Sequence, residues 1–169
     1  MTRHALSSGE VADQALAMWK VHNGITLLLI AELPAEGFAA VPSGSRGRTV
    51  AEQLVHMNRI RLGWLYYHRT GKRPGKSTGK MSRPSRARLR SAFASSGKAV
   101  SRFIAHSLKG KGTPRAFGRQ ALRWMGYLIS HESHHRGQIM LALKQNGIRL
   151  PERLAVQGLW GSWMWGKMR

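Results

Sequence analysis

Two histidines late in the chain, His131 and His135, have the spacing of a chelating pair. Residues four apart lie one turn from each other on the same face of a helix, so their imidazoles can bind one metal ion. The same face continues through Leu128, Gln138 and Ala142, which places the pair on the stripe that a helix turns toward a core. A metal ion bound there would be shielded from bulk water.

Three interpretations of this pair follow from the sequence. The simplest is a helix with chance histidines, since the chain holds 8 His in 169 residues. The second is a zincin, because His131, Glu132 and His135 satisfy the short pattern H-E-x-x-H with Glu132 as general base. The third is a metal site in a helix bundle, where a histidine from another helix completes a facial triad and leaves positions open for water or substrate.

The surrounding elements favour a helical protein. Apolar residues recur at helical spacing and predict four helices, with no convincing strand. They run at about 10–32, at about 50–69, from a cap at Ser82 or Ser85 to about 108, and at about 115–146. Thr49 and Glu52 form the capping-box pattern T-x-x-E at the second start. The prediction is therefore an all-α fold, an up-and-down four-helix bundle, in one domain over 1–169.

Two further histidines lie near the apolar stripes of these helices. His56 borders the apolar face of the second helix, and Gly63 on the same line lets another element approach closely, so His56 is a plausible third ligand. His22 in the first helix is expected to be a hydrogen-bonded core residue. After the last helix comes an aromatic tail with Trp160 and Trp163, which we expect to pack at the mouth of the bundle; a pocket roof and a dimer contact are the alternatives.

Charge is the most unusual property of the composition. The formal net charge is +21, and between residues 53 and 131 there are eighteen Lys and Arg but no Asp or Glu. Such a field attracts nucleic acid, an anionic lipid surface, an acidic protein or a negatively charged small substrate. No aromatic residue lies among the cations from 70 to 90, which argues against base stacking on single strands. The candidate anion-binding residues are Arg73, Lys76, Lys80, Arg83, Arg86 and Arg90.

The chain contains no cysteine. Disulfides, a thiolate metal site and a cysteine nucleophile are excluded, so any thiol chemistry needs an external thiol. The longest apolar run near the start, residues 25–31, is too short to span a bilayer and does not follow a secretory pattern. We therefore expect a cytoplasmic protein with no membrane partner.

Three segments of the chain resemble the DinB-like family, which also includes bacillithiol S-transferases and mycothiol-dependent maleylpyruvate isomerases. They read LVHMNR at 54–59, SHESHHRGQI at 130–139 and NGIRLP at 146–151, and a Gly-Leu-Trp sequence follows. The resemblance implies a four-helix bundle and one divalent metal bound by His56, His131 and His135. It also implies a homodimer and a low-molecular-weight thiol as cosubstrate. An all-imidazole site does not discriminate well among Zn, Ni, Fe and Mn.

This resemblance weakens the zincin interpretation. Helix geometry weakens it as well, because Glu132 lies about 100° around a helix from His131 and is expected to point away from the metal. Gln138, on the ligands' stripe, is expected to hydrogen-bond them. Two functions stay open. One is a metal-dependent thiol S-transferase or hydrolase acting on small electrophilic molecules in stress or detoxification. The other is a basic binding module for nucleic acid or another polyanion, with a structural or vestigial metal.

Overall fold

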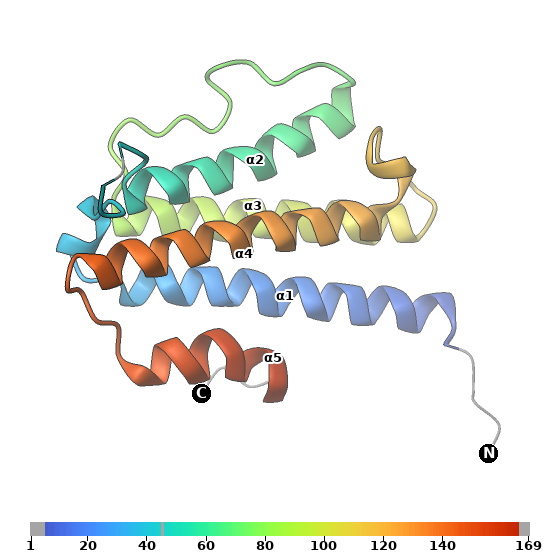
Figure 1. Ribbon diagram of the computed structural model, residues 1–169. Coiled ribbons are helices and arrows are strands. Elements are labelled where there is room, and N and C mark those ends of the chain that lie inside the picture. Colours follow the sequence, from blue (N-terminus) through green and yellow to red (C-terminus); the bar gives the residue numbers. More distant parts are fainter. Residues whose placement is uncertain (1–5, 45, 166–169) are drawn as a thin grey trace.

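The computed structural model describes residues 6–44 and 46–165, and every regular element in that part of the chain is helical (Figure 1). This confirms the all-α prediction for the described residues. The single domain over 1–169 stays a prediction, because residues 1–5, 45 and 166–169 lie outside the described part. The four long helices are α1 (Ser8–Glu32), α2 (Val50–Thr70), α3 (Arg86–Leu108) and α4 (Ala121–Gln145). The shorter elements are η1 (Glu36–Ala39), η2 (Phe117–Arg119), the π-helical η3 (Arg153–Gly161) and α5 (Ser162–Trp165).

Side-chain caps fix the starts of three long helices. Thr49 accepts a hydrogen bond from the backbone N–H of Glu52, and the Glu52 side chain accepts one from the backbone N–H of Thr49, as the sequence predicted. Ser7 and Glu10 form the same box at α1. The hydroxyl of Ser85 caps α3. These caps satisfy N–H groups that have no partner within a helix.

The fourth helix starts later than predicted, at residue 121 rather than near 115. The backbone of Phe117, Gly118 and Arg119 has φ values of 57°, 61° and 63°. Residues in this left-handed region cannot continue a right-handed α-helix. The segment before α4 is therefore a separate turn, and the prediction for this boundary is wrong.

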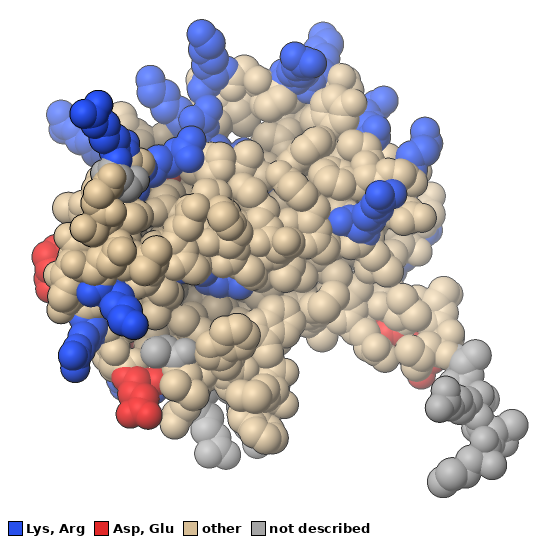
Figure 2. Space-filling model, viewed as in Figure 1, with Lys and Arg blue, Asp and Glu red and all other residues tan. Residues whose placement is uncertain are grey.

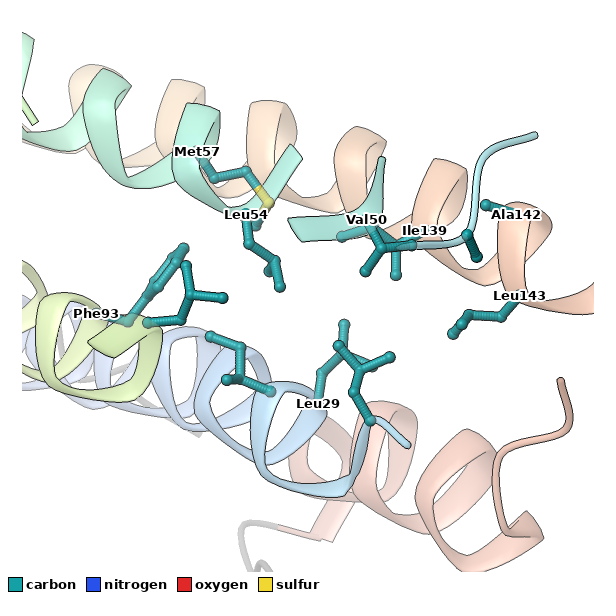
Figure 3. Close-up of a cluster of buried hydrophobic side chains, with 12 residues drawn as sticks. Leu29, Val50, Leu54, Met57, Phe93, Ile139, Ala142 and Leu143 are labelled. Atoms are coloured by element: carbon teal, nitrogen blue, oxygen red, sulfur yellow. The ribbon is translucent and has the colours of Figure 1, made fainter. Parts of the chain in front are cut away.

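Two clusters of buried apolar residues form the core. The first lies where α1 and α4 end and α2 and α3 begin, and includes Leu29, Leu54, Phe93 and Leu143 (Figure 3). It is drawn in full in that view with the residues Leu29, Val50, Leu54, Met57, Phe93, Ile139, Ala142 and Leu143 labelled. The histidine-bearing helices α2 and α4 are thus held at one end by close packing.

The second core cluster lies toward the opposite ends of the same helices. It includes Trp19 from the first half of α1, Leu65 from the end of α2, Ile104 from the end of α3 and Trp124 from the start of α4. Read together, the two clusters show that α2 and α3 run in the same direction, opposite to α1 and α4. The direction does not alternate between α2 and α3, so the up-and-down topology predicted from the sequence is wrong for this pair of helices.

The physical reason is the connection between α2 and α3. Residues 71–85, here called the crossover segment, run back along the length of α2 before α3 begins (Figure 1). A connection of this length can span roughly 50 Å when extended, which exceeds the length of a 21-residue helix at about 1.5 Å per residue. Parallel neighbours in a bundle require such a crossover.

The C-terminal elements η3 and α5 lie against α1 and not over an end of the helices (Figure 1). Leu154, Gly158 and Ser162, four residues apart, form their buried stripe. A Cβ added at Gly158 would lie 2.7 Å from Leu28, so only glycine permits this approach. The tryptophans fall on the other side, with Trp160 64% and Trp163 37% exposed. The prediction that they pack at the bundle mouth is therefore wrong.

Candidate metal centre

Helices α2 and α4 bring His56, His131 and His135 together. One ligand nitrogen from each ring lies within 4.8 Å of the other two. The ring centroids are 5.3 Å apart for His56 and His131, 4.8 Å for His56 and His135, and 4.7 Å for His131 and His135. Imidazole nitrogens bind zinc at about 2.0–2.1 Å. A movement of under about 1 Å by each ligand nitrogen toward their common centre therefore brings all three within reach of one ion.

Local sequence explains this meeting point. His131 and His135 lie one turn apart on α4, and His56 lies in the second turn of α2, which the Thr49 cap fixes. Pro74 of the crossover segment packs against Gly63, where an added Cβ would lie 3.4 Å from the proline ring, an ordinary van der Waals contact. The triad therefore lies between α4 and the face of α2 that the crossover segment covers.

The electrostatics of the site keep the three imidazoles neutral at pH 7. The pKa of His135 is lowered to about 4, mainly by burial and then by the neighbouring His131 and His56. Burial also lowers the pKa of His56, followed by the charges of Arg48 and Arg59. The pKa of His131 falls through burial as well, although Glu132 opposes that shift. Neutral imidazoles offer the lone pair that a metal ion needs.

The nitrogens of the triad are only partly satisfied by the protein. Nδ1 of His131 is buried and has no hydrogen-bond partner among the described residues. Nδ1 of His135 lies 3.4 Å from the side-chain oxygen of Gln53. A buried nitrogen without a partner costs free energy unless a ligand binds it. The donor set therefore fits a divalent metal ion.

The two glutamines near the triad have different contacts. Gln138, predicted to hydrogen-bond the ligands, places its amide nitrogen 2.9 Å from the exposed His134. Burial and the neighbouring histidines lower the pKa of His135, and a hydrogen bond with Gln138 is the one influence that raises it. Sequence reasoning missed the role of the buried Gln53, although it precedes His56 by three residues and so lies on the same face of α2.

Glu132 points away from the triad into a closed polar network, as its position on the helix predicted. Arg61 donates hydrogen bonds from Nε and Nη2 to the two carboxylate oxygens at 2.6 and 2.7 Å, and Nε2 of His22 lies 2.9 Å from one of them. Burial alone would raise the pKa of Glu132, but Arg61 and His22 hold it at about 2. All three residues are fully buried.

This network decides against the zincin interpretation. Both oxygens of Glu132 are occupied by Arg61 and His22, so the carboxylate cannot act as a general base on a water at the triad. His22 is a hydrogen-bonded core residue, as predicted. Sequence reasoning missed Arg61, because its partner Glu132 lies 71 residues away and no local pattern links them.

A cavity of about 780 Å³ opens beside the triad, between α2 and the crossover segment. His56 lines it, together with the rings of Trp64, Tyr67 and Tyr127. Tyr127 also stacks on His131, with ring centroids 5.8 Å apart. A small molecule in this cavity can therefore contact His56, the one triad histidine that lines it.

The six predicted anion-binding residues separate in the structure. Arg73 and Lys76 line the cavity, whereas Arg86 donates a hydrogen bond to the backbone carbonyl of Leu33 and helps to hold the end of α1. The side chains of Lys80, Arg83 and Arg90 are exposed and do not line this cavity. Sequence reasoning missed Arg48 and Arg59, which do line it; Arg59 follows His56 by three residues, a spacing that signals a shared face.

Comparison with known families adds to this geometry. The family model of the DinB superfamily matches residues 19–139, which is more than half of the chain and includes all three histidines. The chain belongs to the DinB superfamily. No curated protein matches it. The matched part of this DinB superfamily chain ends before η3 and α5, so the C-terminal elements lie outside the family model.

None of the described helices of this DinB superfamily chain combines the length and the apolar content that crossing a membrane would require.

The Lys and Arg side chains of the protein gather over the crossover segment and the neighbouring face of α2, whereas Asp and Glu are few on the same view (Figure 2). Arg73 and Lys76 of the crossover segment also line the cavity beside His56.

Proposed function

We propose that this protein is a DinB-like four-helix bundle in which His56, His131 and His135 bind one divalent metal ion. The observation that carries the proposal is the meeting of three neutral imidazoles from two helices, with ligand nitrogens within 4.8 Å of one another. The unpartnered Nδ1 of His131 supports it, as does membership of the DinB superfamily. Zn, Ni, Fe and Mn all suit this donor set.

The reaction that we propose is thiol transfer to a small electrophile, or hydrolysis with water in place of the thiol. A divalent ion held by three imidazoles supplies a Lewis acid that lowers the pKa of a thiol or of water. In the transfer, the sulfur loses its proton and forms a bond to an electrophilic carbon. The bond to the leaving group breaks, and that group departs with the electron pair and takes a proton from water.

The residues around the cavity supply binding and orientation for this reaction. The chain has no cysteine, so the thiol must be a low-molecular-weight cosubstrate that enters from outside. Trp64, Tyr67 and Tyr127 offer apolar surface that excludes water from the reacting groups. Such chemistry removes reactive electrophiles, so we propose a role in stress or detoxification, and a homodimer as the functional form.

Elemental analysis is the first test. The wild-type protein should contain about one divalent ion per chain after dialysis, as expected for a single three-histidine site. His135→Ala should lose the ion, whereas the matched variant His134→Ala, altered at the adjacent exposed histidine, should keep it. Equal metal content in His135→Ala and wild type would contradict the proposed site.

Activity is tested next on the metal-loaded protein. We expect conjugation of 2-mercaptoethanol to 1-chloro-2,4-dinitrobenzene, or hydrolysis of an activated ester, to stop on addition of a chelator and to resume with the metal. Rates that do not respond to the chelator would exclude the metal-dependent reaction while leaving metal binding itself intact. Light scattering in solution tests the homodimer in the same samples.

A second candidate function rests on the basic face in Figure 2. We propose as the alternative that Lys80, Arg83, Arg90 and their neighbours bind the phosphates of nucleic acid without sequence preference, with a structural metal. Each phosphate contact adds roughly 0.9 to the slope of log affinity against log salt concentration. Duplex DNA should then bind at 50 mM salt and dissociate steeply as salt rises, and absence of binding at 50 mM would end this alternative.

A further inference from the structure

The cavity beside the triad has an aromatic side. Trp64 packs edge-on against Tyr67, Tyr127 and Phe117, with ring centroids 5.8, 6.0 and 4.7 Å apart. Trp64, Tyr67 and Tyr127 each present surface to the cavity. Rings held by their neighbours in this way offer flat apolar area without a large loss of side-chain entropy on binding.

Four cationic side chains line the same cavity. Arg48 precedes α2, Arg59 belongs to α2, and Arg73 and Lys76 come from the crossover segment, so three parts of the chain direct positive charge toward one space. No carboxylate lines this cavity, and none of the four cations has a carboxylate partner within residues 6–44 and 46–165. Four like charges around a concave space without a counter-charge attract an anion.

One of these cations also holds the cavity in shape. Arg59 donates hydrogen bonds from Nε to the backbone carbonyl of Thr78 at 3.3 Å and from Nη2 to that of Lys76 at 3.5 Å. Gly79 approaches the same side chain so closely that a Cβ there would lie 2.9 Å from it. Arg59 therefore positions the crossover segment and with it Arg73 and Lys76.

The cations share the cavity with one histidine of the triad. Arg48 and Arg59 line the same cavity as His56. A field that acts on this imidazole also acts on any ligand beside it. These cations and the histidine triad thus belong to one electrostatic environment.

We infer that this cavity binds a small molecule in which an oxyanion is joined to an apolar or aromatic body. The oxyanion lies toward Arg48, Arg73 and Lys76, and the body lies against Trp64, Tyr67 and Tyr127. The volume of about 780 Å³ falls within the range of small-ligand pockets, which is about 300–1,000 Å³. The inference deepens the proposed function, on which it rests for the reaction at the triad, and names the class of its substrate.

The experiment compares three probes with the same ring system: 1-naphthoate, 1-naphthyl phosphate and the neutral 1-naphthamide. Binding is measured by titration calorimetry at low salt on protein freed of metal with a chelator, so that no probe can bind a metal ion. At least one of the anions should bind about tenfold more tightly than the amide, because a hydrogen bond to a charged group is roughly twice as strong as one between neutral groups. The two anions distinguish a carboxylate site from a phosphate site.

Charge-matched variants locate the effect. The double variant Arg73→Gln with Lys76→Gln should lose the preference for the anion, and Arg48→Gln should weaken it. The control Lys98→Gln with Arg102→Gln removes the same charge from the exposed face of α3 and should leave the preference unchanged. Equal affinity for anion and amide in the wild type, or an equal loss in the control variant, would overturn the inference.

The outcome is separable from that of the proposed function. His135→Ala should lose the metal but keep the preference for the naphthalene anion in the metal-free comparison. If wild-type protein binds no metal while the preference persists, the proposed function fails and the cavity inference stands. Metal binding without any anion preference gives the reverse result.

Discussion

Adjacent residues of α4 belong to two regions that differ in their charges and in how their side chains pair. His131 belongs to a triad of neutral imidazoles beside a cavity, and its Nδ1 has no hydrogen-bond partner among the described residues. Glu132, the next residue, is buried against Arg61 and His22, and its two oxygens are both hydrogen-bonded. Both regions are polar and are built mainly from α2 and α4.

The difference separates a structural polar cluster from a ligand site. In the first region the donors lack a counter-charge, so a cation with open coordination positions would complete it. In the second, positive and negative groups meet with short hydrogen bonds that occupy both carboxylate oxygens, although Nδ1 of the buried His22 also has no partner among the described residues. A pattern such as H-E-x-x-H cannot make this distinction, because it does not show which side of the helix each residue faces.

The largest effect is expected from breaking the buried network of Glu132, Arg61 and His22. Glu132→Ala leaves Arg61 buried without its partner and should lower the free energy of unfolding by about 3–5 kcal/mol. Chemical denaturation of the metal-free protein measures this loss. A double variant, Glu132→Leu with Arg61→Met, removes both charges and should lie closer to the wild type. A loss below about 1 kcal/mol in Glu132→Ala would mean that the network does not stabilise the fold.

Breaking the histidine triad should instead affect metal affinity. His56→Ala removes one of the three proposed ligands, and the affinity for Zn²⁺ should fall by more than about 100-fold, since even changes to residues that hydrogen-bond a ligand cost about 10–100-fold. Competition with a chromophoric chelator measures the affinity. His106→Ala, at an exposed histidine of α3, is the control and should bind the ion as the wild type does.

A third histidine environment sharpens the comparison through pH. Burial among Trp64, Phe103 and Trp124 lowers the pKa of His68 from 6.5 to about 4, so the folded protein binds its proton less readily than the unfolded chain does. The stability from this group is complete above pH 6.5 and falls as the pH drops toward 4.

The variant His68→Phe lacks this titration. The difference in free energy of unfolding between wild type and His68→Phe should therefore move in favour of the variant by about 2 kcal/mol between pH 7 and pH 5. Denaturation curves at the two pH values give the measurement. A difference that stays constant with pH would show that His68 titrates normally in the folded protein.

The smallest effect is expected at the edge of the histidine triad. Gln53 is buried, and its side-chain oxygen lies 3.4 Å from Nδ1 of His135. Gln53→Leu removes this acceptor and should weaken Zn²⁺ binding by about tenfold, because such a contact orients a ligating ring. The same chelator competition applies, and the variant Gln138→Leu shows whether the second glutamine contributes.

Much of the local structure could be predicted from the sequence. The apolar periodicity located the four long helices, the T-x-x-E pattern located the start of α2, and the four-residue spacing placed His131 and His135 on one face. These features depend on residues within two turns of one another, where backbone geometry is nearly fixed. His56 was also identified, because its neighbours on the helix signalled a packed face.

Features that depend on distant partners could not be predicted. Helical periodicity carries no information on the direction of a helix, so the parallel arrangement of α2 and α3 became visible only in the structure. The pairing of Arg61 with Glu132 and the arrival of Arg73 beside Arg48 each depend on how the helices pack. The same holds for the tail, where Gly158 meets Leu28 of α1.

The crossover segment has a consequence for how this protein could acquire new specificity. None of residues 71–80 belongs to either apolar cluster, yet Arg73, Pro74 and Lys76 border the cavity next to His56. Within residues 71–80, the residues other than Gly71 and Gly79, which have positive φ, can therefore be exchanged without disturbing the packing that holds the imidazoles. A library of variants confined to this ten-residue stretch would alter which molecules enter while the reactive centre stays the same, as antibody loops vary on a constant framework.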